Sequence, residues 1–261
     1  MTVTLILMMK ESGIAMLSVP QMQDVTDLPV MDRGAWQTTS TGGYWSIEHP
    51  HPRDVIFDDI ALGMSRVCRF AGQIDERFDF YAVTEHSVVM TEHAIETGQA
   101  RTVEDALAIL LHDGSEAFYG DMPTPMKELL PGYKLIEKNA QRCIMRSFGL
   151  DHGRVRISDR DIKILDWRSF LAECDQLLTD PARNTRLQVL KQQMPMLAPI
   201  DCRLQALAPV ASRAAFVDCF LSLPQILPAR DPAWLDSIAH HYEAATAMRV
   251  RMAIPTPTCE I

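Results

Sequence analysis

The chain has 261 residues, of which 47% are hydrophobic and 23% are charged, and its formal net charge is −9. This length is enough for one large domain with a sizeable core, or for one domain with an appendage. An acidic surface repels the phosphate backbone of nucleic acids, so we expect no binding to a nucleic-acid polymer. A local basic pocket for one small anion remains compatible with this charge.

Cysteine usage and the apolar segments bear on the compartment. Six cysteines are present, and no two of them form a C-x-x-C pair. We interpret them as reduced thiols of a cytoplasmic protein. The apolar run at 3–9 has no basic residue before it, so we expect no secretion signal. No segment approaches the roughly 20 apolar residues of a membrane span, so we expect no membrane association.

Hydrophobic spacing predicts an all-α fold, because strand signals are scarce. After a mostly irregular N-terminal segment we expect one short strand and turn at 42–47. The predicted helices, in chain order, cover residues 58–70, 83–97, 103–119, 134–148, 159–178, 212–223 and 233–251. Asp58 or Asp59 can cap the first helix, and Thr102 can cap the third with Asp105 as its reciprocal partner.

The strongest candidate for chemistry is the pair His112-Asp113, which follows the apolar run 106–111. We interpret the pair as lying in the middle of the third helix. Burying an imidazole and a carboxylate there is costly unless a partner such as a divalent metal ion compensates. His86 and Asp166, on two other predicted helices, complete a set of two imidazoles and two carboxylates. Such a set suits Mn²⁺, Co²⁺, Fe²⁺ or Zn²⁺.

Further charged residues could act on a substrate at this metal site. Glu116 would share a helix face with His112, and Asp121 follows in the next turn. Carboxylates beside a metal can move protons to or from water and a leaving oxygen. Arg69, at the end of the first predicted helix, and Lys127 could each contact a phosphate group.

The remaining histidines lack a comparable pattern. His93 lies seven residues after His86 and could face a second ion, but we interpret it as a helix-surface side chain. We interpret the others as surface side chains too: His49, His51, His152, His240 and His241.

The order and spacing of four stretches resemble those of an HD-domain phosphohydrolase. The stretches are CRFAG at 68–72, YAVTEHS at 81–87, LLHDGSEA at 110–117 and GDMPTPMK at 120–127. Within that superfamily the chain is similar to the bacterial 5'-deoxynucleotidases and the related phage dATP triphosphohydrolases, from about residue 43 to about residue 223. The resemblance implies an HD-domain helical bundle with a central metal site. We accordingly divide the chain into an N-terminal segment (1–40), an HD phosphohydrolase domain (41–223) and a C-terminal helical extension (224–261), which we cannot match.

The resemblance also implies roles for nine side chains. The metal ligands would be His86, His112, Asp113 and Asp166, and the catalytic residues would be Glu116 and Asp121. The substrate would be contacted by Arg69 and Lys127 at the phosphate and by Phe70 near the sugar or base. The later segment with Asp166 and Glu173 resembles the one that supplies the last metal ligand. Gln73 departs from the pattern, because many relatives have a histidine there.

The function implied by the resemblance is metal-dependent hydrolysis of the phosphate ester of a deoxynucleotide. A monophosphate would give nucleoside and phosphate, whereas a triphosphate would give nucleoside and triphosphate, and the sequence favours neither. One alternative is a regulatory HD module that senses a nucleotide without turnover. Another is a structural protein whose tail, 224–261, docks a partner. By analogy with relatives we also expect self-association into a homo-oligomer.

Overall fold

The computed structural model describes residues 32–150 and 153–253, and within them the chain is mostly helical, as predicted. The helices are α2 (Phe57–Arg66), α3 (Val83–Glu96), α4 (Val103–Leu110), α5 (Glu116–Tyr119), α6 (Thr124–Leu129), α7 (Pro131–Ser147), α8 (Asp159–Leu177), α9 (Thr185–Gln193), α10 (Pro209–Ile226), α11 (Pro232–Ser237) and α12 (Ala239–Ala253). Short 3-10 turns are η2 (Pro52–Asp54), η3 (Arg69–Gly72) and η4 (Pro181–Arg183). Most of the predicted irregular segment 1–40 lies outside the described residues.

A small hairpin precedes the helices. Strand β1 (Trp36–Thr38) pairs antiparallel with β2 (Tyr44–Ser46), and Trp36 lies opposite Ser46. The predicted strand at 42–47 is therefore confirmed, and its partner strand lies inside the segment that we expected to be irregular. Trp45 is fully buried, and its indole donates a hydrogen bond to Tyr119. This hydrogen bond ties the hairpin to α5, the short helix that follows His112-Asp113.

The helix starts follow local capping chemistry where a suitable side chain is present. Thr102 is the N-cap of α4 as predicted, with its hydroxyl accepting from the backbone N–H of Asp105 at 3.3 Å and donating to the Asp105 carboxylate at 3.0 Å. The predicted cap of the first helix is wrong, because Ile56 precedes α2 and makes no side-chain cap. Asp59 instead accepts hydrogen bonds from Thr41, so it ties the hairpin loop to α2.

Three predicted helices are shorter or more broken than expected, and one of them, 103–119, stops at Leu110 and resumes as α5. The first ends at Arg66 rather than Phe70, since the chain turns into η3, where Phe70 has a φ of 57°. The predicted helix at 233–251 is broken at Ile238, which separates α11 from α12. The break lets Ile238 and Trp234 both face the core, where each is almost fully buried.

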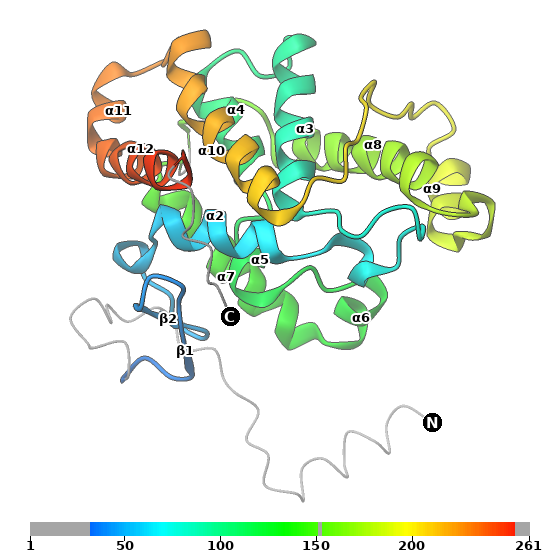
Figure 1. Cartoon of the computed structure of the whole chain (residues 1–261), viewed down its shortest axis with the longest axis horizontal. Coiled ribbons are helices and arrows are strands. Elements are labelled where there is room, and N and C mark those ends of the chain that lie inside the picture. The colour runs from blue at the N-terminus through cyan, green and yellow to red at the C-terminus, as the bar shows by residue number, and fades with distance from the viewer. Residues whose placement is uncertain (1–31, 151–152, 254–261) are drawn as a thin grey trace, which may run out of the picture.

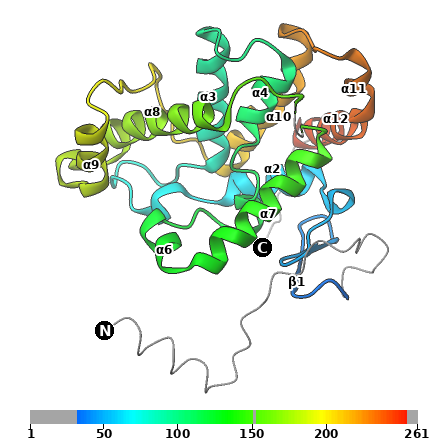
Figure 2. The same cartoon turned by 180° about the vertical axis from the view of Figure 1, so that it is seen from behind.

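The helices lie side by side around one extended core. Figure 1 shows α8 and α9 at one end, α11 and α12 at the opposite end, and α3, α4 and α10 between them. The reverse view in Figure 2 shows α7 running across the back and α6 below it. Large buried side chains fill the centre, among them Trp45, Phe57, Phe148, Phe216 and Phe220. Burial of an aromatic side chain stabilises the fold by roughly 1.5–3 kcal/mol.

The C-terminal helices pack on this same core. Helix α10 runs through residues 223 and 224, and Phe220 stacks on Tyr242 of α12 with ring centroids 4.4 Å apart. Nothing in these contacts tests the proposed division at 224, which stays a prediction. Among the described helices, none is both long and apolar enough to cross a membrane.

Candidate metal centre

His86 lies at the centre of the molecule, on the first turn of α3, and is fully buried. Its Nδ1 is 2.6 Å from the Glu173 carboxylate on α8. A carboxylate can only accept, so Nδ1 carries the proton, and the Nε2 lone pair of a neutral ring points the other way. Nε2 lies 3.3 Å from Nε2 of His112, 3.7 Å from Asp113 and 3.5 Å from Asp166.

His112 and Asp113 do not lie inside a helix, contrary to our prediction. Helix α4 ends at Leu110, and the pair lies in the turn that leads into α5. The turn is clamped by Gln141 of α7, whose amide donates to the Leu111 carbonyl at 2.6 Å and accepts from the Ser115 backbone N–H at 3.0 Å. A half-buried side chain thus holds backbone groups of the turn where the helix is interrupted.

The turn directs Nε2 of His112 toward the same point. Nδ1 of His112 lies 2.8 Å from the backbone carbonyl of Ile109, which can only accept, so Nδ1 carries a proton. Nε2 also lies 3.1 Å from the Asp113 carboxylate. Burial opposes protonation of the ring, but Asp113 raises the pKa of His112. The two Nε2 atoms therefore face each other beside Asp113, whose charge would stabilise a cation between them.

Asp166 joins the histidines from α8, on the side away from the turn. His86, His112 and Asp166 each offer one ligand atom, and these atoms all lie within 4.8 Å of one another. Two nitrogens bound to one ion at about 2.0–2.1 Å in tetrahedral or octahedral geometry would lie roughly 2.9–3.4 Å apart, which matches the 3.3 Å found here. These three residues can hold a divalent metal ion, and Asp113 lies next to them.

The charges around the cluster favour ionised carboxylates. Burial alone would raise the pKa of Asp113, but His112, His86 and Arg69 hold it far below its ordinary value. Burial likewise opposes ionisation of Asp166, but Lys163 and the two histidines keep its pKa lowered. Anionic oxygens next to free imidazole nitrogens form the donor set that a hard or borderline divalent cation prefers.

Glu116 begins α5 directly after the turn and is almost fully buried. Burial, followed by the charges of Asp113 and Asp121, raises its pKa well above the ordinary value. One carboxylate oxygen lies 3.7 Å from Nζ of Lys127, and the other is buried without a hydrogen-bond partner among the described residues. Lys127, on α6, is held in place by Glu137 of α7 at 2.5 Å.

Asp121 lies in the loop between α5 and α6, after Gly120, whose φ of 78° suits glycine. Its charge acts on both Glu116 and Arg69. Arg69 is buried and lies in η3, with Nη2 3.0 Å from Glu173 and Nη1 3.7 Å from Asp113. Its buried Nε has no hydrogen-bond partner among the described residues.

Phe70 follows Arg69 and faces α8 rather than the histidines. Its ring stacks on Phe170 with centroids 6.0 Å apart. Among non-glycine residues a φ of 57° is uncommon, and Ala71 shares it with 51°. Two consecutive left-handed residues bend the chain sharply, and this bend turns Arg69 inward toward Glu173.

The structure thus brings together eight of the nine predicted site residues, and Phe70 lies against Phe170 beside them. Sequence reasoning missed the supporting roles of Glu173, Gln141 and Glu137. The first had a usable signal, because Asp166 and Glu173 are seven residues apart on one helix and therefore share a face. The other two lie on α7, far along the chain from their partners, and no local pattern indicates them.

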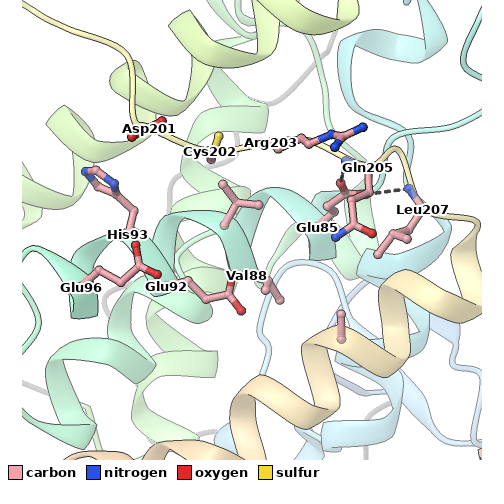
Figure 3. A pocket seen from close by; sticks show the side chains of 12 residues that line it. Glu85, Val88, Glu92, His93, Glu96, Asp201, Cys202, Arg203, Gln205 and Leu207 are labelled. Atoms are coloured by element: carbon pink, nitrogen blue, oxygen red, sulfur yellow. Dashed lines mark hydrogen bonds between the residues drawn. The ribbon is translucent and has the colours of Figure 1, made fainter.

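His93, which we expected on the helix surface, is 7% exposed and lines a pocket of about 240 Å³ between α3 and the segment 201–207. Figure 3 shows His93, Glu96 and Asp201 at one end of this pocket, and Gln205 and Leu207 at the other. None of the cluster residues lines it. His93 therefore belongs to a separate region and takes no part in the metal cluster.

Comparison with known proteins gives matches over part of the chain. No family model matches the chain. An uncharacterized protein of Rhodobacter capsulatus is 32% identical over 144 residues, which cover 55% of this chain and 73% of that protein. The chain belongs to the family of that protein. The uncharacterized protein YfdR of Escherichia coli is 34% identical over 112 residues, which cover 43% of this chain and 57% of YfdR.

A shorter match links the chain to proteins whose names state an activity. The 5'-deoxynucleotidase YfbR of Salmonella newport is 40% identical over 76 residues, which cover 24% of this chain and 38% of that protein. A 5'-deoxynucleotidase of Klebsiella pneumoniae gives the same values. The chain therefore spans well under two thirds of YfdR and of these deoxynucleotidases. The all-α fold carries a His–His–Asp cluster that is consistent with an HD-type metal site.

Proposed function

We propose that this protein is a metal-dependent phosphohydrolase that cleaves the 5'-phosphate ester of a deoxynucleotide. The observation that carries the proposal is the convergence of His86, His112 and Asp166 on one point, with Glu116 and Lys127 close by. Imidazole nitrogens and acidic oxygens that can hold a metal ion, a carboxyl group that can carry a proton and a cationic side chain are parts suited to phosphate-ester hydrolysis.

The comparisons supply the substrate class in this proposal. The relatives that carry an activity in their name are 5'-deoxynucleotidases, so we take a deoxynucleotide with a 5'-phosphate as the substrate. The net charge of −9 agrees with a small anionic ligand that enters a local basic pocket, and it disfavours a nucleic-acid polymer. Self-association and a cytoplasmic location stay expectations from the sequence.

Each residue of the cluster would have its own role in hydrolysis of the phosphate ester. A divalent cation held by His86, His112, Asp113 and Asp166 would polarise a phosphoryl oxygen and favour ionisation of the attacking water. Lys127 would place its charge against the phosphate, and the unpartnered Nε–H of Arg69 offers a further donor for a phosphoryl oxygen.

Glu116 would move the proton. In hydrolysis the water oxygen bonds to phosphorus, the bond from phosphorus to the sugar oxygen breaks, and that sugar oxygen gains a proton. A carboxyl group whose pKa is raised by burial can hold this proton until the ester bond breaks. Asp121, whose charge reaches Glu116, would help to keep the proton there.

The test is an assay of the purified full chain with each of the four dNMPs and each of the four dNTPs. Each substrate is incubated with Mn²⁺, Co²⁺, Zn²⁺ or no added metal, and the products are separated by chromatography. We expect nucleoside and phosphate from at least one dNMP, and no turnover by Asp113→Asn. Nucleoside and triphosphate from a dNTP would keep the hydrolase but change its substrate. No turnover with any metal would overturn the proposal and favour a nucleotide-sensing module.

A further inference from the structure

Glu173 occupies an unusual position behind the metal centre. It is fully buried on α8, and its two carboxylate oxygens lie next to four side chains that can donate hydrogen bonds. One oxygen lies 2.6 Å from His86, 3.1 Å from the Tyr81 hydroxyl and 3.2 Å from the Ser169 hydroxyl, and the other lies 3.0 Å from Arg69.

These contacts leave Glu173 no freedom to bind the metal itself. Glu173 forms an ion pair with Arg69, with 3.0 Å between Nη2 and a carboxylate oxygen. A carboxylate in an ion pair only accepts, and each of the four neighbours is placed to donate to it. A buried charge of this kind is tolerated because it is both paired and hydrogen-bonded.

We infer that Glu173 is a positioning residue for the metal centre, because it holds the proton of His86 on Nδ1 and turns Nε2 toward His112 and Asp166. The inference rests on the metal site of the proposed function, but it concerns how this chain prepares a ligand rather than what it hydrolyses. Arg69 supports the arrangement from the other side, since it neutralises Glu173 and reaches Asp113.

Geometry explains why one carboxylate is required. A glutamine at this position has one acceptor oxygen and one NH₂ group, so it can accept from His86 or from Arg69 but not from both. Its NH₂ group would face a donor on the remaining side. The substitution Glu173→Gln therefore keeps the shape of the side chain and removes its hydrogen bond to either His86 or Arg69. Its effect then reports on the positioning of His86 and not on the packing of the side chain.

The experiment measures metal affinity rather than turnover. Apo protein is titrated calorimetrically with Mn²⁺ and with Co²⁺, and the visible spectrum of the Co²⁺ form reports the ligand geometry. We expect Glu173→Gln to weaken binding by about 10–100-fold and to change the Co²⁺ spectrum, as is typical when the partner of a ligating histidine is lost. The matched control is Tyr81→Phe, which removes another donor to the same carboxylate oxygen without touching a ligand, and it should change affinity far less.

Two outcomes overturn the inference: equal metal affinity of Glu173→Gln and wild type, or equal losses in Glu173→Gln and Tyr81→Phe. If Glu173→Gln does not fold, ¹⁵N–¹H NMR of the histidine rings in wild-type apo protein decides, since the inference requires the His86 proton on Nδ1. A proton on Nε2 would overturn it. If wild type binds no metal, the proposed function fails, while the NMR result still tests the role of Glu173.

Discussion

Two buried histidines show how strongly surroundings decide what a side chain can do. His86, at the centre, and His241, between α12 and α7, are 0% and 1% exposed. Carboxylates of α8 and of the turn after α4 surround His86. His241 instead stacks on Phe148 with ring centroids 3.9 Å apart, and within the described part of the chain its Nε2 lies against the hydroxyl and carbonyl of Ser147.

The difference is visible in the charge that each ring can carry. The carboxylates near His86 would stabilise the positive charge of a metal ion. Around His241 burial dominates and the neighbouring His240 adds to it, so the pKa of His241 falls to about 4 and the ring stays neutral. One region is suited to hold a cation and the other excludes it. The sequence pattern singled out His86, but it did not indicate that His241 is buried.

The largest expected effect follows from removing His86. The substitution His86→Ala deletes a nitrogen ligand, and loss of the ion would remove several kcal/mol of transition-state stabilisation, or about 10³-fold in kcat. His241→Ala should instead lower stability by about 3 kcal/mol, as for other buried aromatic rings, with kcat of the folded fraction unchanged. Steady-state kinetics and thermal unfolding of both variants check the pair, and equal losses of kcat would erase the distinction.

Most of the helices could be predicted from the sequence, and His86, His112 and Asp166 lie close together as expected, while the roles of the site residues stay a prediction. The spacing of apolar residues gave helices α3 and α8 to within one residue at each end. The histidines and carboxylates of the cluster stood out because such residues are rare in apolar surroundings. A pattern of this kind reports which residues are buried, and burial of several ionisable groups in one bundle leaves few arrangements other than a shared site.

What the sequence could not show depends on contacts between distant segments. The apolar run before His112 looks like an uninterrupted helix, and the side chain that holds the turn where that helix stops is Gln141, 30 residues after Leu111. His241 looks like a surface residue because neither Phe148 nor Ser147 is near it in the chain. Local periodicity carries no information about either partner, so both predictions were wrong for the same reason.

A smaller loss of activity is expected from Glu116→Gln, which removes the proton carrier and leaves the cluster intact. General acid–base catalysis contributes about 10²–10⁴-fold, so kcat should fall by roughly 10²-fold or more with little change in metal affinity. The matched control is Glu137→Gln, because Glu137 contacts the same lysine from outside the cluster. Its pair with Lys127 is partly exposed and worth at most about 1 kcal/mol, equivalent to about fivefold in rate. Equal effects of the two substitutions would contradict the role of Glu116.

The smallest effect on turnover is expected from His241→Phe. This substitution also tests most directly whether the surroundings of His241 exclude a positive charge. The folded protein holds the pKa of His241 at about 4, below its ordinary value of 6.5, so the unfolded chain binds the proton first as the pH falls. The contribution of His241 to stability is therefore complete above pH 6.5 and is lost between pH 6.5 and 4, by about 2 kcal/mol at pH 5. A phenylalanine keeps the stack on Phe148 and cannot titrate, so the variant should lose less stability than wild type on acidification.

Urea unfolding of both proteins at pH 7.5, 6 and 5 measures the difference, to which His240 contributes little because both proteins retain it. Parallel pH curves for the two proteins would mean that His241 accepts a proton in the folded state, and the contrast between the two buried histidines would then be lost.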